Sequence, residues 1–78
     1  MKTFDDVIDQ IDTLINNDMD VDVINDVIGQ IGEKFNLDTE QYGCTPTGLE
    51  EACFELKLTQ KQINEICEAT LNSLQDSV

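Results

Sequence analysis

The sequence predicts a small all-α protein, either a four-helix bundle or an orthogonal array of helices. Two observations carry this prediction. Apolar residues recur at spacings of three and four along most of the chain, and no stretch is long enough or regular enough in its alternation to build a sheet. The chain has 78 residues, about 40% of them apolar, which suits one hydrophobic core. We therefore expect one folded domain over residues 1–78.

The first two helices are expected at about residues 3–16 and 21–35. Thr3 followed by Asp6 has the outline of a capping box, in which two side chains satisfy each other's backbone N–H groups. In the first helix the apolar positions are Phe4, Val7, Ile8, Ile11, Leu14 and Ile15. In the second they are Ile24, Val27, Ile28, Ile31 and Phe35. Each set marks one face of an amphipathic helix.

The second half of the chain is expected to hold two more helices, at about 47–57 and 60–75, after a connecting loop at 36–46. Thr47 with Glu50 and Thr59 with Gln62 are further capping-box pairs. The third helix is predicted to bury Leu49, Ala52, Cys53 and Leu56. In the fourth, the helical period is carried by Ile63, Ile66, Cys67, Thr70, Leu71 and Leu74.

The apolar spacing of this C-terminal helical hairpin resembles that of a helix-turn-helix, with Lys57 in place of the usual turn glycine. An ordinary helical hairpin fits the same spacing. DNA reading by the hairpin is not expected, because the last helix carries Lys61 as its single base against Glu65 and Glu68.

Charge is the most unusual property of the chain. Seventeen acidic residues against four basic ones, with no histidine, give a net charge of -13. Residues 1–40 hold eleven acids and two bases, and residues 41–78 hold six acids and two bases. Direct binding to nucleic acid or to an anionic membrane is not expected, because both depend on Lys and Arg near phosphates.

The acids of the first half form two predicted helical stripes, whose members are Asp5, Asp9, Asp12, Asp22, Asp26 and Glu33. Like charges at these spacings oppose helix stability. A basic partner protein would account for them, and so would a solvated face that only confers solubility. If the two helices are adjacent, their carboxylates together approximate the spacing of phosphates along DNA. In charge alone, the pattern resembles DNA-mimic proteins that block restriction enzymes, CRISPR effectors or transcription factors.

No catalytic, cofactor or metal site is expected. Nucleophilic use of a cysteine normally needs a nearby base, and the chain has no histidine. Cys53 and Cys67 fall on apolar helix faces, and no pair of cysteines has the spacing of a zinc site. Asp18, Asp20 and Asp22 open like a calcium loop, but Val23 and Gly29 stand where that loop needs Gly and Glu. We interpret this segment as an interhelical turn with an Asp cap.

The sequence therefore favours a non-enzymatic inhibitor or regulator that occupies a basic, nucleic-acid-binding surface of another protein. Met19 and Tyr42 are expected to add contacts from the connecting loops. The alternative is a helical interaction or assembly module, docking a partner helix or forming a homodimer, for which Phe54, off the apolar face, is the indicator residue. The absence of a secretory signal pattern and the odd number of cysteines suggest a cytoplasmic protein.

Overall fold

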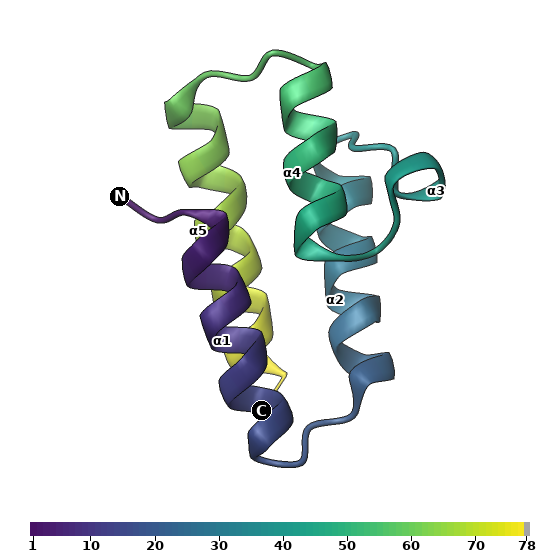
Figure 1. The fold of residues 1–78 in the computed structure, drawn as a ribbon, viewed down its shortest axis with the longest axis vertical. Coiled ribbons are helices and arrows are strands. Elements are labelled where there is room, and N and C mark those ends of the chain that lie inside the picture. The colour runs from purple at the N-terminus through teal and green to yellow at the C-terminus, as the bar shows by residue number, and fades with distance from the viewer. Residues whose placement is uncertain (78) are drawn as a thin grey trace.

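The computed structural model describes residues 1–77, in which the chain forms five helices and no strand (Figure 1). In chain order these are α1 (Phe4–Asn16), α2 (Val21–Lys34), α3 (Thr39–Tyr42), α4 (Pro46–Glu55) and α5 (Gln60–Asp76). The all-α prediction is confirmed. The boundaries predicted for the first, second and last helices lie within one residue of those observed.

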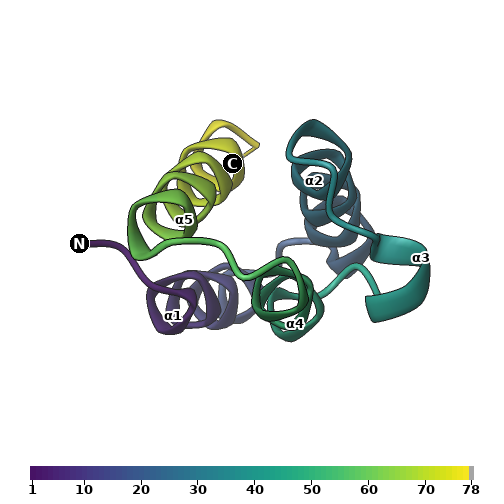
Figure 2. The same cartoon turned by 90° about the horizontal axis from the view of Figure 1, so that it is seen from above.

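The four long helices form an array in which α1 and α5 run in one direction and α2 and α4 in the other (Figure 1). Seen from above, α1 and α2 occupy one diagonal of the array, and α4 and α5 the other (Figure 2). α5 packs against both α1 and α2, whereas α4 packs against α1, α2 and the short α3. The C-terminal hairpin is therefore present in chain order, but its two helices lie mainly against other elements.

Two of the expected capping boxes are present. At α1 the Thr3 N–H donates to Asp6 Oδ2 over 2.9 Å, and the Asp6 N–H donates back to Thr3 Oγ1 over 3.4 Å. At α5 the Thr59 N–H donates to Gln62 Oε1 over 2.8 Å, and the Gln62 N–H donates to Thr59 Oγ1 over 3.2 Å. These bonds satisfy backbone donors that the first helical turn leaves without partners.

The start of α4 was predicted one residue late and with the wrong cap. Pro46 is the first helical residue, and the cap is Thr45, whose Oγ1 accepts from the Gly48 N–H over 3.0 Å. Pro suits this position because it lacks the N–H that a first turn leaves unpaired. The predicted Thr47 and Glu50 pair is therefore wrong, since both residues already lie inside the helix. The helix also ends at Glu55, two residues before the predicted end.

The connecting loop at 36–46 was predicted without regular structure, and it contains α3. The Asp38 side chain caps this turn by accepting from the Gln41 N–H over 3.0 Å. α3 packs closely on α2, since a Cβ at Gly32 would collide with the Thr39 side chain. The glycine that weakens α2 as a helix former thus allows this contact.

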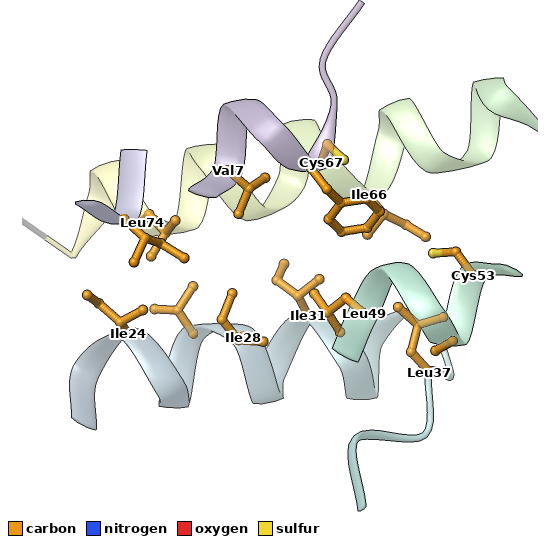
Figure 3. Packing of buried hydrophobic residues seen from close by; sticks show 14 of the residues in the cluster. Val7, Ile24, Ile28, Ile31, Leu37, Leu49, Cys53, Ile66, Cys67 and Leu74 are labelled. Carbon is orange, nitrogen blue, oxygen red and sulfur yellow. The ribbon is translucent and has the colours of Figure 1, made fainter. Parts of the chain in front are cut away.

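The core lies between the helices (Figure 3). Ile24, Ile28 and Ile31 of α2 point toward Val7 of α1 and Leu74 of α5. Cys53 and Cys67 are both buried in the same cluster, as predicted from their helix faces. Thr70 is buried as well, and its hydroxyl donates to the Ile66 carbonyl over 2.7 Å, so it adds no unpaired polar group.

Three apolar side chains expected in the core are exposed instead. Ile8 and Ile15 are 38% and 43% exposed, because they lie seven residues apart at the edge of the face that Phe4, Val7, Ile11 and Leu14 bury. Leu56 is 54% exposed. It is the residue that caps the end of α4, and it borders a hollow lined also by Tyr42 and Glu55, which leaves about half of its surface exposed.

Lys57, in the turn between α4 and α5, has a left-handed backbone conformation. Its φ is 54°, a value at which a non-glycine residue is strained. A glycine would be less strained at this position.

Candidate protein-binding surface

The acidic stripe of α1 lies on the side of the helix away from the core. Asp5, Asp9 and Asp12 are all exposed. The residues that α1 buries, which are Phe4, Val7, Ile11 and Leu14, define the opposite face. The helix presents one apolar face and one anionic face because the two residue sets follow the same helical period with a different phase.

The stripe of α2 is built in the same way. Asp22, Asp26 and Glu33 are exposed, opposite a buried face that consists of Ile24, Val27, Ile28, Ile31 and Gly32. Both acidic stripes are therefore accessible to a partner along their full length.

The two stripes do not lie on one face of the molecule. α1 and α2 stand at opposite corners of the array, and each turns its buried face inward (Figure 2). The carboxylates of the two helices consequently point to opposite sides. The expectation that adjacent helices would together match the phosphate spacing of DNA is wrong, because α5 and α4 fill the positions next to α1.

The turn between α1 and α2 joins the stripes at one end of the molecule. Asp18 adopts a φ of 67°, and the Asp20 carboxylate accepts from the Asp22 N–H over 2.9 Å, the Asp cap expected from the sequence. Residues 3–33 contain nine acids and no base. An acidic band therefore runs down α1, around the turn at residues 17–20 and along α2. We call residues 3–33 the acidic band, and the end of the molecule at the turn of residues 17–20 the acidic end.

Helix dipoles add to the negative potential at the acidic end. α1 and α5 run in the same direction, so both C-termini lie there, and neither helix has a basic residue in its last turn. An uncompensated helix C-terminus acts as roughly half a negative charge. α2 begins at this end with a positive pole, which Asp20 already caps.

Of the three residues expected to make additional contacts, two are half-buried and one is exposed. Met19 and Tyr42 are half-buried and pack against the core, so neither projects as an anchor. Partial burial, followed by the nearby carboxylates of Glu55, Asp38 and Glu51, raises the pKa of the Tyr42 hydroxyl. Phe54 is 70% exposed, in agreement with its predicted position off the apolar face.

Sequence reasoning missed a groove between α1 and α5, with a volume of about 470 Å³. Its lining residues are Lys2, Asp6, Asp9, Gln10, Thr13, Leu71, Asn72 and Gln75. Asp9 is the one member of the predicted stripe that reaches it. The available signal was the row of polar residues beside the apolar face of each helix, but only the packing of α5 on α1 brings the two rows together.

Comparisons with protein-family models, with curated proteins and with solved structures find no match to this chain. Within residues 1–77, no helix has the length and apolar character needed to cross a membrane. In the same residues, no three Cys, Asp or Glu side chains are grouped closely enough to hold a metal ion. The arrangement of charge is therefore the main basis for assigning a function.

Proposed function

We propose that this protein is a non-enzymatic inhibitor or regulator that occupies a basic, nucleic-acid-binding surface of a partner protein, in the manner of an anti-restriction or anti-CRISPR protein that mimics DNA. The observation that carries the proposal is the acidic band, with nine acids and no base in residues 3–33 and all six stripe carboxylates exposed.

The geometry favours a cleft over a flat surface as the binding site on the partner. The two stripes face opposite sides, and the molecule measures only 16 Å along its shortest principal axis. A flat basic surface would contact one stripe at a time, whereas a cleft with basic walls would contact both. Nucleic-acid-binding proteins often present such clefts to surround a strand or duplex.

The mimicry would operate through overall charge. Successive stripe carboxylates are separated by three or four residues, a rise of about 4.5–6 Å along the helix axis, except Asp26 and Glu33, which are seven residues and about 10.5 Å apart. One DNA strand presents a phosphate about every 3.4 Å. A single stripe is therefore sparser than a DNA strand, so individual carboxylates cannot replace individual phosphates along a partner. Coulombic steering, which raises association rates and weakens in salt, would supply the attraction.

Two variants of equal charge test the proposal. In the first, Asp5, Asp9, Asp12, Asp22 and Asp26 are changed to Asn; in the second, Glu50, Glu51, Glu55, Glu65 and Glu68 are changed to Gln. Both move the net charge from -13 to -8. Each immobilised variant is used to capture partners from a lysate at low and high salt, and captured proteins are tested for displacement of bound duplex DNA.

We expect the wild type and the Gln variant to capture a DNA-binding protein at low salt and to displace its DNA, and the Asn variant to lose both properties. Equal capture by all three proteins, or capture that is unchanged at high salt, would contradict the proposal. Equal losses in the two variants would show that net charge matters and the position of the acids does not.

A second candidate function is a helical interaction module whose acidity serves only solubility. Phe54 favours it, since this side chain is 70% exposed beside a hollow of about 240 Å³ lined also by Phe4 and Ile63. Leu56 is exposed as well, but it borders a separate hollow beside Tyr42 and is not part of this surface. Such a surface suits docking by a partner helix or by a second copy of the chain.

Sedimentation and binding by Phe54→Ser test this second function. We expect the substitution to dissociate a dimer or abolish partner capture without lowering the free energy of unfolding, because the side chain is exposed. A monomeric wild type whose partner binding survives Phe54→Ser would remove this candidate.

A further inference from the structure

The groove between α1 and α5 is lined by side chains that accept hydrogen bonds. Asp6 and Asp9 contribute carboxylates, Gln10, Asn72 and Gln75 contribute amide oxygens, and Thr13 contributes a hydroxyl. Leu71 is the one apolar residue in the lining. With a volume of about 470 Å³, the groove falls within the size range of sites that receive a ligand side chain or small molecule.

The packing of α5 along α1 explains why these residues meet. The two helices run in the same direction (Figure 1), and the Lys2 N–H, just before α1, donates to Asn64 Oδ1 of α5. Asp6, Asp9, Gln10 and Thr13 follow one another at helical spacings along one side of α1, and Leu71, Asn72 and Gln75 do so along α5. The groove is therefore bordered by one polar row from each helix.

Most of these acceptors are free. No hydrogen bond joins the side chains of Asp9, Gln10, Asn72 or Gln75 to another of the residues 1–77. One oxygen of Asp6 is engaged by Thr3, which leaves the other available. The Thr13 hydroxyl donates to the Asp9 carbonyl and keeps its lone pairs. Lys2 provides the single positive charge of the lining, at the end beyond Asp6.

We propose that this groove receives an arginine side chain from the basic partner protein. The inference rests on the proposed function and adds a specific contact to it. Arginine fits better than lysine because its planar guanidinium has five N–H donors and can serve carboxylate and amide oxygens together, whereas lysine has three donors on a point charge. Leu71 supplies an apolar contact for the methylene stem of the arginine.

The test uses nonaarginine and nonalysine peptides as probes, with affinities measured by fluorescence anisotropy at fixed ionic strength. Asp9→Asn and Asp12→Asn form a matched pair, since both remove one exposed carboxylate from α1 but only Asp9 lines the groove. The double variant Asn72→Ala with Gln75→Ala changes the groove without changing net charge. All four positions are exposed, so circular dichroism should show an intact fold.

We expect the wild type to bind nonaarginine at least about 5-fold more tightly than nonalysine, which reflects loss of charge-assisted hydrogen bonds. Asp9→Asn should weaken nonaarginine binding by about 5-fold or more, and Asp12→Asn by at most about 2-fold. The amide double variant should lower the affinity for nonaarginine several-fold and leave that for nonalysine unchanged.

The two proposals fail in different ways. Salt-dependent binding of both peptides with equal affinity, or equal effects of Asp9→Asn and Asp12→Asn, would overturn the arginine site while leaving the acidic surface as a binding surface. An unchanged affinity of the amide double variant for nonaarginine would have the same consequence. Absence of salt-dependent binding to either peptide would overturn both the arginine site and the proposed function.

Discussion

Asn16→Lys should stabilise the protein by relieving charge at the acidic end. Asn16 is exposed in the last turn of α1, and this turn has no basic residue. A lysine there would lie four residues after Asp12, the spacing and order that favour an ion pair on a helix. It would also place a positive charge at the negative pole of the helix dipole.

Three contributions set the size of the expected stabilisation. The pair with Asp12 contributes about 0.2–0.5 kcal/mol, and the dipole contributes about 0.3–1 kcal/mol. Replacing Asn by a better helix former adds a few tenths of a kcal/mol. We expect the free energy of unfolding to rise by about 1 kcal/mol, which for a domain of this size raises Tm by about 4–8 °C.

Asn16→Gln is the matched control, because Gln and Lys have similar helix propensities and only Lys is charged. Chemical denaturation of both variants is measured at low salt and at about 1 M NaCl, where the Debye length falls to about 3 Å. The advantage of Lys over Gln should be present at low salt and largely lost at high salt. If Lys is no better than Gln at low salt, or keeps its advantage at high salt, the electrostatic account of the acidic end is wrong.

Three further predictions concern the fold. Gly29→Ala should raise the free energy of unfolding by about 1 kcal/mol, since the new methyl would meet only Cys44 Sγ at 3.6 Å. Gly48→Ala should lower it by about 1–3 kcal/mol, because its methyl would collide with the Tyr42 and Gly43 carbonyl oxygens. If urea denaturation shows that both substitutions stabilise, or that both destabilise, this packing is contradicted. Lys57→Gly should add about 0.5–1 kcal/mol by removing left-handed strain, and Lys57→Ala, which retains the strain, should add nothing in the same assay. Burial, followed by the neighbouring Cys53, raises the pKa of the Cys67 thiol from 9.0 to about 12, so the folded state favours the neutral thiol. The stability that the neutral thiol contributes should be complete below pH 9 and should be lost as the pH rises from 9 to 12. Cys67→Ala should therefore flatten this part of a plot of unfolding free energy against pH.

Much of the fold follows from local signals in the sequence. Thr3 with Asp6 and Thr59 with Gln62 mark helix starts because a capping box involves only residues within one turn. The same reasoning failed at α4, where two threonines flank Pro46 and either could serve as the cap. Pro decides in favour of Thr45, because a first-turn position is the one place where a helix tolerates its missing N–H.

The burial of individual apolar side chains could be predicted only where the neighbouring helices cover the whole apolar face of a helix. Val7 and Ile8 are equally apolar, yet Val7 is fully buried and Ile8 is exposed. Val7 lies within the face that Phe4, Ile11 and Leu14 also form, whereas Ile8 lies about 100° further round the helix at the edge of that face. Helical periodicity marks the apolar side of α1, but the width of the strip that the neighbouring helices cover depends on tertiary packing.

In the candidate site, too, local features could be predicted from the sequence and nonlocal ones could not. Exposure of Asp5, Asp12 and Asp26 follows from helical phase, and sequence reasoning placed them correctly on surfaces. Their assembly into one face required α1 and α2 to be adjacent, and nonlocal packing places them diagonally instead. The groove beside Asp9 depends on the parallel packing of α5 against α1, residues 62 positions apart, and no local pattern encodes it.

Solubility requires net charge but no particular distribution of it. Net charge keeps a protein soluble wherever it lies, and interspersed bases reduce repulsion at little expense in net charge. Here Lys34, Lys57 and Lys61 all lie at helix ends far from the turn at residues 17–20, and Lys2 precedes α1 at its far end. The acidic end is left uncompensated where two helix C-termini meet. An arrangement that opposes stability is expected where a surface is kept for binding, and this is the reason for proposing a binding role here.

Asn16→Lys separates the two explanations because it changes stability and binding in opposite directions. If the acidic end binds a basic partner, Asn16→Lys should reduce partner affinity while it raises the free energy of unfolding, and Asn16→Gln should leave affinity unchanged. The loss should shrink at high salt, as screening weakens both the attraction and its removal. A more stable Asn16→Lys variant that binds its partner as tightly as the wild type would assign the acidic end to solubility alone.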